Sequence, residues 1–330
     1  MLKPITRYLR TFARLGLCGA ALLALLTACG PASPEPAAPA LDGRIAFVSE
    51  RHTQVFGVSV SVSYGLYVLD LGAPDASGFV IVPDDALLSH PTWSPSGERL
   101  MAYRMTYDAE RGYRRRIVLA DARAPYEQEI FEDAWIGRSP AWSPDGQQVA
   151  FSNGSTIRIY DVETRQQRKV LEAPGGVWDP TWSPDGRRIA FRHSPDVSAS
   201  PGLTAARGIA VLGVEDGAFL QLTFNEADMS PAWSPDDRIA FQREGDIYVM
   251  ACDGTQVTRL TRDGQSFSPA WSPDGESIAF LSSRNRECGA WFLDSPPFCT
   301  NGLYVMDADG SHVRLLRQED ERIGDLVWGF

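Results

Sequence analysis

The heptapeptide PAWSPDG at residues 140–146 recurs with small changes as PTWSPSG (91–97), PTWSPDG (180–186), PAWSPDD (231–237) and PAWSPDG (269–275). A short apolar run follows every copy, such as Ile189-Ala190-Phe191 or Ile278-Ala279-Phe280. From Trp93 to Trp271 the repeated Trp has a mean spacing of about 45 residues, which matches the length of a four-stranded propeller blade. The sequence is therefore predicted to fold as a series of similar β units.

Each repeat also contains two further β runs with turn residues between them. Residues 245–250 (GDIYVM) form one such run, the turn Cys252-Asp253-Gly254 follows, and residues 257–261 (VTRLT) form the last. Short β runs separated by turns predict one four-stranded antiparallel sheet per repeat. Within the phrase, Ser-Pro-Asp-Gly suits a tight turn, because Pro presets φ and Gly takes a left-handed conformation. We expect the Trp to pack between neighbouring sheets.

The two ends of the repeat region complement each other. Residues 43–47 (GRIAF) are an apolar run of the repeat type without a Trp phrase before them, and residues 325–328 (DLVW) are a Trp strand without the rest of a repeat. We therefore predict an all-β fold, a six-bladed β-propeller of four-stranded antiparallel blades. In this fold the C-terminal strand pairs with the N-terminal blade, and ring closure removes exposed sheet edges.

The N-terminal segment has the pattern of an export signal. An apolar run over residues 15–26 follows four basic residues, as in a secretory signal peptide. Leu26-Thr27-Ala28-Cys29 then resembles the lipobox of bacterial lipoproteins, in which the Cys is acylated. We expect a signal peptide over residues 1–28, a lipidated Cys29 with a Pro/Ala-rich tether over 29–41, and the propeller over 42–330.

This organisation implies an exported protein that is lipid-anchored to the bacterial membrane and faces the periplasm or the cell exterior. Loss of the signal peptide, with its four basic residues, changes the formal net charge from −11 to −15. Such an acidic surface is not attracted to anionic lipid headgroups, so membrane association is expected to come from the acyl chains on Cys29. The same acidity argues against a nucleic-acid partner.

The pattern PxWSPDGxxIAF…IYVMDxDG…LT over residues 43–330 resembles the WD-like repeats of the TolB β-propeller family. In that family the propeller is periplasmic and binds a peptidoglycan-associated lipoprotein. The family's founding member also has an N-terminal α/β domain, for which the short segment before residue 43 has no room. The resemblance therefore implies the fold and a binding role in the envelope rather than the same partner.

Strand order predicts that one face of the propeller carries the short turns and the other carries the long insertions. The insertions are residues 51–64, 104–113, 194–206 and 282–301; we call the face that carries them the long-loop face. Three Trp residues outside the repeat phrase also belong to it: Trp135, Trp178 and Trp291. Exposed aromatics on loops suit binding anchors, whereas Trp135 and Trp178 equally suit plugs between blades.

Residues just before the innermost strands are expected to surround the mouth of the central channel. These are His90, Arg138, Asp179, Asp228, Phe267 and Asp325. A mixed polar ring at a pore suits a small-ligand or peptide site. The alternative is that these residues are solvated loop ends.

Three cysteines remain beyond the signal and the anchor. In an oxidising compartment, a bond between Cys288 and Cys299 is expected to staple the 282–301 insertion. Cys252 is left over at a turn position. It is either a free thiol or the site of a bond to another chain.

The sequence contains no catalytic signature of the common hydrolase, metalloprotease, nucleotide-binding or dinucleotide-binding types. We therefore predict no catalytic residue, no cofactor and no metal site. The favoured function is a monomeric, non-catalytic module that binds an envelope protein, peptide or glycan at the long-loop face. The alternative is an enzyme that acts at the channel mouth, such as a polysaccharide lyase or hydrolase.

Overall fold

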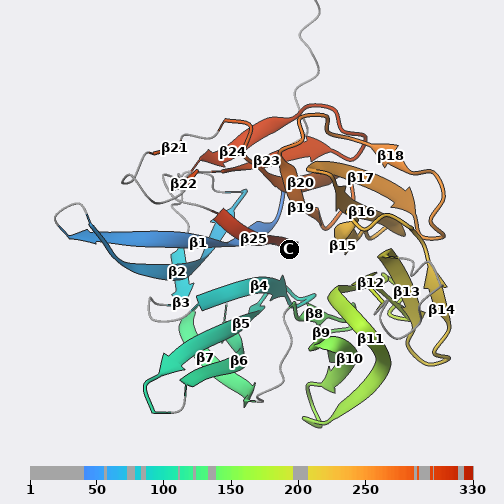
Figure 1. The fold of residues 1–330 in the computed structure, drawn as a ribbon, viewed down its shortest axis with the longest axis horizontal. Coiled ribbons are helices and arrows are strands. Elements are labelled where there is room, and N and C mark those ends of the chain that lie inside the picture. The colour runs from blue at the N-terminus through green and yellow to red at the C-terminus, as the bar shows by residue number, and fades with distance from the viewer. Residues whose placement is uncertain are drawn as a thin grey trace, which may run out of the picture. The chain divides into compact units, whose positions relative to one another are not determined.

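The computed structural model describes residues 41–55, 58–72, 79–82, 87–110, 112–121, 124–132, 139–195, 207–285, 288–289, 298–299, 301–318 and 323–329. Residues 41–330 form one compact unit. Every secondary-structure element in the described part of this unit is a β-strand (Figure 1). The all-β prediction is therefore confirmed.

Four antiparallel sheets have four strands each. The first contains β25 (Ile323–Gly329), β1 (Arg44–Val55), β2 (Val58–Asp70) and β3 (Phe79–Val82). The second contains β4 (Leu87–Trp93), β5 (Arg99–Asp108), β6 (Gly112–Asp121) and β7 (Ala124–Glu132). The third contains β15 (Met229–Trp233), β16 (Arg238–Arg243), β17 (Asp246–Ala251) and β18 (Thr258–Arg259). The fourth contains β19 (Ser266–Trp271), β20 (Ser277–Ser282), β23 (Gly302–Asp307) and β24 (Arg314–Gln318).

The remaining strands form a seven-stranded sheet and a small hairpin. The seven-stranded sheet contains β8 (Ala141–Trp142), β9 (Gln148–Ser152), β10 (Gly154–Asp161), β11 (Gln167–Trp182), β12 (Arg188–His193), β13 (Gly208–Gly213) and β14 (Phe219–Gln221). The hairpin contains β21 (Cys288–Gly289) and β22 (Phe298–Cys299).

The long strand β11 explains why two repeats share one sheet. Its first half pairs with β10, with Gln167 opposite Tyr160, and its second half pairs with β12, with Trp182 opposite Ile189. The outermost strand of one repeat therefore continues directly into the innermost strand of the next (Figure 1). Two separate strands are expected here from the sequence, but the structure has one strand that runs from Gln167 to Trp182.

The last strand of the chain pairs with the first. In β25 and β1, Trp328 lies opposite Ile45 and Gly329 lies opposite Arg44. The indole Nε1 of Trp328 also donates a hydrogen bond of 2.9 Å to the carbonyl oxygen of Asp42. Residues from the two ends of the propeller region thus complete one four-stranded sheet.

The repeated Trp residues pack between sheets, as predicted. All six, including Trp328, are between 6% and 9% exposed. Trp182 donates a hydrogen bond to the carbonyl of Ala141 at 3.0 Å, and Trp271 donates one to the carbonyl of Ala232 at 3.1 Å. Each of these bonds joins the Trp to the innermost strand of the preceding repeat. A buried indole N–H usually finds such a partner, which makes these two contacts specific, whereas the indole N–H groups of Trp93 and Trp142 are buried without an acceptor among the described residues.

Arginine side chains reinforce the same junctions. The guanidinium of Arg188 lies 5.0 Å from the ring centre of Trp233, and that of Arg238 lies 4.6 Å from the ring centre of Trp271. Arg238 also donates to the carbonyl of Gly275 at 3.0 Å, in the turn that follows Trp271. Each Arg thus ties its own sheet to the Trp and turn of the next one.

The Ser-Pro-Asp-Gly turn is closed by its own side chains. The hydroxyl of Ser183 donates to Asp185 at 2.5 Å, and Asp185 also accepts from the backbone N–H of Arg187 at 3.0 Å. Gly186 has a φ of 69°, as the turn requires. The hydrogen bond from Ser183, followed by that from Arg187, lowers the pKa of the Asp185 carboxyl.

We expect Asp185→Asn to reduce stability by about 0.5–1 kcal/mol at neutral pH, the worth of an ordinary hydrogen bond. Because the folded state lowers the pKa of Asp185 from its ordinary value of 3.8, its contribution is complete above that value. The contribution is lost as the pH falls through the lower pKa of the folded protein. Urea unfolding between pH 2.5 and pH 7 measures this difference. A Glu163→Gln variant, changed at an exposed side chain, is the control. If wild type and Asp185→Asn differ in stability by the same amount at every pH, the role assigned to the Asp185 carboxylate is contradicted.

Two of the predicted insertions are strand extensions rather than loops. β1 and β2 stay paired out to Val55 and Val58, and β5 and β6 stay paired out to Asp108 and Gly112. Residues 58–64 (VSVSVSY) contain alternating β-branched side chains, which favour extended pairing. The long-loop face therefore carries projecting hairpins. The centres of the other two insertions, 196–206 and 290–297, lie outside the described residues.

Candidate functional site

A left-handed backbone position near the start of each innermost strand brings one residue to the central channel. In five repeats, the residue before the first Pro of the repeat phrase has a positive φ: His90 (52°), Ser139 (67°), Asp179 (54°), Ser230 (51°) and Ser268 (52°). The pairing register shifts at this point in β4, β11, β15 and β19. Such conformations are uncommon for residues other than Gly and cost about 1–3 kcal/mol each. Bulges of this kind redirect a side chain out of the regular pleat.

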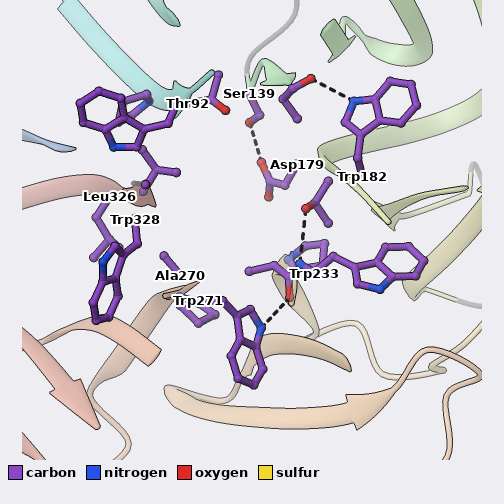
Figure 2. A pocket seen from close by; sticks show the side chains of 18 of the residues that line it. Thr92, Ser139, Asp179, Trp182, Trp233, Ala270, Trp271, Leu326 and Trp328 are labelled. Carbon is purple, nitrogen blue, oxygen red and sulfur yellow. Dashed lines mark hydrogen bonds between the residues drawn. The ribbon is translucent and has the colours of Figure 1, made fainter. Parts of the chain in front are cut away.

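Asp325 has the corresponding place in β25, three residues before Trp328. These six positions, called the rim residues below, all line one cavity of about 520 Å³. The remaining lining comes from Pro, Thr, Ala, Trp and Ser residues of the repeat phrases and from residues 326–329 of β25, and most of it is apolar. Figure 2 shows Thr92, Asp179, Ala270 and Leu326 around the open space, while the ring of Trp182 points away from it. The cavity therefore has apolar walls and a polar rim.

His90, Asp179 and Asp325 form a cluster on this rim. The imidazole Nδ1 of His90 lies 3.5 Å from Asp325 Oδ2, and its Nε2 lies 4.0 Å from Asp179 Oδ1. The backbone N–H of His90 donates to Asp325 at 2.9 Å, and the hydroxyl of Ser139 donates to Asp179 at 2.8 Å. All three charged or titratable side chains are between 27% and 37% exposed. The structure thus brings together three residues that the sequence placed at the channel mouth.

Asp228 does not belong to the rim. Its side chain is fully buried, and both carboxylate oxygens accept hydrogen bonds from Arg243, at 2.6 and 2.9 Å. Arg243 in turn stacks 5.0 Å from the ring centre of Tyr248. The prediction for Asp228 is wrong because a buried carboxylate with a bidentate partner is a structural ion pair.

Phe267 is also displaced from the predicted ring. It lies inside β19 and lines a separate cavity with Gln242 and Gln265 rather than the central one. The rim position of this strand is Ser268, the next residue. Arg138, Trp135 and Trp291 lie outside the described residues.

Trp178 is partly exposed in β11 and does not line the central cavity. The guanidinium of Arg192, its partner across the ladder, lies 5.2 Å from its ring centre. The ring also lies directly over Gly176, where an added Cβ would meet it at 1.8 Å. Gly176 is therefore required for this placement of Trp178.

Ser139, Ser230 and Ser268 are rim residues that the sequence analysis missed. The signal was available, because every rim residue precedes its repeat Trp by three positions. The ring was instead predicted from polar or large residues near the start of each strand, which gave Arg138, Asp228 and Phe267. The structure shows that the third residue before the Trp faces the channel, because the backbone at this position directs its side chain there.

The described cysteine side chain, Cys252, is partly buried. Its thiol donates to Asp237 at 3.1 Å. Burial, followed by this hydrogen bond, raises the pKa of the Cys252 thiol. Because the thiolate is the reactive form, Cys252 is expected to react slowly at neutral pH.

The backbone brings Cys288 and Cys299 into direct opposition as Cα partners in the β21–β22 ladder. Opposite residues of an antiparallel pair have Cα atoms about 4.5–5.5 Å apart, within the range of a disulfide. We predict that peptide mapping without reductant finds a Cys288–Cys299 crosslink and a free Cys252. A crosslinked peptide that contains Cys252 would contradict this pairing.

Within the described ranges, no group of three or more His, Cys, Asp or Glu residues is arranged to hold a metal ion. The same part of the chain contains no helix long and apolar enough to cross a membrane.

Comparison with protein families gives a clear match. The family model described as the TolB beta propeller domain matches residues 37–201 and 101–295. No curated protein matches the chain.

Several solved structures have a similar fold. TolB from Acinetobacter baumannii has a TM-score of 0.68 and 20% identity, with 88% of this chain and 67% of that chain covered. A protein assigned as TolB from Agrobacterium tumefaciens has a TM-score of 0.60 and 19% identity, with 84% and 90% covered. A chain of the nidogen/laminin complex has a TM-score of 0.61 at 8% identity, with 87% and 99% covered. At these identities the likeness concerns the fold.

Proposed function

The chain belongs to the TolB β-propeller domain family, and from this premise we propose that it is a non-catalytic binding module of the bacterial cell envelope. Its partner is a protein or peptide segment that enters the channel at the rim residues. The observation that carries this proposal is the cavity of about 520 Å³ with apolar walls and a polar rim. Sites of this size usually combine an apolar lining with a few polar groups that fix orientation.

The propeller is proposed to be a closed ring of six blades. The pairing of β25 with β1 supports closure. Contacts between successive innermost strands also support it, because β25 contacts both β4 and β19. Counting the two repeats that share β11 separately gives six sheets around the channel. A closed ring gives the rim a fixed circumference, which a preorganised site needs.

A binding role is favoured over catalysis by the geometry of the rim. Ser139 donates its hydroxyl proton to Asp179 and not to His90. The rim therefore lacks the Ser–His pair of common hydrolases, in which an imidazole takes the proton of the nucleophile. The two carboxylates beside His90 favour a ligand with a cationic or hydrogen-bond-donating group.

The envelope location rests on the sequence of the first 41 residues. The basic and apolar segments of a signal peptide precede Cys29, and residues 30–41 have the composition of an extended tether. A Pro-rich segment of this length extends about 3.1 Å per residue. We propose that Cys29 is lipidated and that the tether holds the propeller away from the membrane.

Affinity capture from a crosslinked envelope fraction tests the proposed function. Wild-type protein is expected to capture one or a few envelope proteins. The double variant His90→Asn/Asp179→Asn should retain at least tenfold less of them, since it removes the imidazole and a carboxylate, and a hydrogen bond to a charged group such as the carboxylate is worth about 1.5 kcal/mol or more. Gln166→Ala, changed at an exposed turn residue, is the control and should capture the same amount as wild type. Equal capture by all three proteins contradicts the rim as the binding site.

A further inference from the structure

A second cavity, of about 600 Å³, lies between the third and fourth four-stranded sheets. It is lined by Gln242 of β16, Phe267 of β19, Ser283 and Arg284 after β20, and Gln265 in the loop between the two sheets. We call it the inter-blade groove. It shares no lining residue with the central cavity.

The loop that carries Gln265 is held by a buried carboxylate. Asp246 is 2% exposed. Its Oδ1 accepts hydrogen bonds from the hydroxyl of Thr261 at 3.0 Å and from the backbone N–H groups of Asp263 and Gly264 at 3.0 and 3.2 Å. Its other oxygen binds Arg259. A buried carboxylate with this many donors fixes the loop in one conformation before any ligand arrives, which lowers the entropy cost of binding.

The side of the groove that carries Arg284 is also held in place, and its charge is neutralised. Arg284 pairs with Asp263 at 2.7 Å. Its guanidinium lies 4.8 Å from the ring centre of Tyr304 and 5.3 Å from that of Phe280. With the charge of Arg284 neutralised, the groups left for a ligand are uncharged.

Those groups are two side-chain amides, a hydroxyl and an aromatic ring. Among the described residues, neither the Gln242 nor the Gln265 amide has a hydrogen-bond partner, and each offers both donors and an acceptor. Phe267 is half-buried and forms an apolar part of the lining. A ligand that fits this set needs paired hydroxyl groups beside an apolar face, which is the chemistry of a sugar ring.

The backbone N–H and carbonyl groups beside the groove already form hydrogen bonds with each other. The N–H of Ser283 donates to the carbonyl of Gln265 at 3.0 Å, and the N–H of Ser266 donates to the carbonyl of Gly245 at 2.6 Å. β16 is also paired on both sides, with β15 and β17. A peptide therefore finds no open strand edge to extend, which is the usual way that a sheet binds an extended chain.

The equivalent groove at the preceding blade junction has different chemistry. It is lined by Arg192, His193, Ser194, Arg207, Glu226 and Ala227, and Arg207 pairs with Glu226 at 2.9 Å. Arg192 has the place in β12 that Gln242 has in β16, and Ala227 has the place of Gln265. The pair of amides is therefore not repeated at this junction.

We propose that the inter-blade groove is a saccharide-binding site that takes an uncharged hexose or N-acetylhexosamine unit. The two Gln amides bind ring hydroxyls, and Phe267 packs against the apolar face of the ring. This proposal does not rest on the proposed binding of a protein at the rim. The two sites have separate linings, so an experiment that contradicts one proposal leaves the other unaffected.

A glycan array tests the proposal. The purified protein is applied to neutral hexose and N-acetylhexosamine oligosaccharides and to uronic-acid oligosaccharides. We expect binding to neutral glycans and at least tenfold weaker binding to the uronic acids, because the groove has no unpaired cation. Loss of one hydrogen-bonding amide is expected to weaken binding by about tenfold, so Gln242→Ala and Gln265→Ala should each show this loss.

Two further variants separate binding from folding. Phe267→Leu keeps an apolar side chain in the core but removes the ring, and it should also weaken binding at an unchanged melting temperature. Gln166→Ala should bind as wild type does, and the rim variant His90→Asn/Asp179→Asn should too. No binding to any neutral glycan, binding to uronic acids alone, or equal binding by wild type and the three groove variants would overturn the proposal.

Discussion

Deletion of residues 323–330 is expected to lower the melting temperature by at least about 10 °C or to abolish folding. The deletion removes β25, which completes the first sheet and contains the buried Ile323 and Trp328. Loss of side chains of this size from a core costs about 2–5 kcal/mol each. It also leaves an edge of β1 unpaired, and exposed edges promote aggregation. At this chain length each kcal/mol corresponds to about 2 °C or slightly more.

Differential scanning calorimetry of the purified protein measures this effect. Asp325→Asn is the matched control, because it keeps the strand and changes one half-exposed side chain on the rim. Its melting temperature should lie within about 2 °C of the wild-type value, as expected for a surface change. An unchanged melting temperature after the deletion would show that the last strand does not close the ring.

Arg243→Ala is expected to lower the free energy of unfolding by about 3–5 kcal/mol, the typical result of breaking a buried ion pair. It leaves the carboxylate of Asp228 buried, with neither guanidinium hydrogen bond. The stacking of Arg243 on Phe241 and Tyr248 is lost as well. The hydrogen bond to Asp228 raises the pKa of Arg243.

Urea unfolding with a double-mutant cycle measures this coupling. Asp228→Asn/Arg243→Ala should be more stable than Arg243→Ala alone, because no buried charge then lacks its partner. Arg187→Ala, an exposed arginine of the turn face, should change stability by less than about 0.5 kcal/mol. If Arg243→Ala costs no more than Arg187→Ala, the ion pair is not a structural element.

The Trp residues show how much of the fold the repeat phrase predicts. Because one large indole per repeat must be buried, the phrase predicts both the strand and the junction it occupies. Trp182 and Trp271 have this role in the structure. The fused strand β11 was not predicted, since nothing in residues 167–182 distinguishes a continuous strand from two strands with a connection.

The candidate site could be predicted only in part. His90, Asp179 and Asp325 were predicted because each is a polar residue near the start of an innermost strand. Asp228 has a similar position, five residues before Trp233, but it is paired with Arg243, a residue fifteen positions further along the chain. Sequence spacing alone does not reveal such a partner. The inter-blade groove was also not predicted, because its two amides come from different repeats and meet only when the sheets pack.

The most direct test of the binding role is site-specific photocrosslinking in living cells, with a benzophenone amino acid at the rim position Ser268. The account predicts a covalent adduct with one envelope protein. That adduct should be at least tenfold weaker in the His90→Asn/Asp179→Asn background and absent with the same probe at Gln166, in an exposed turn. No adduct from Ser268, or the same adduct from both positions, would contradict a partner at the channel mouth.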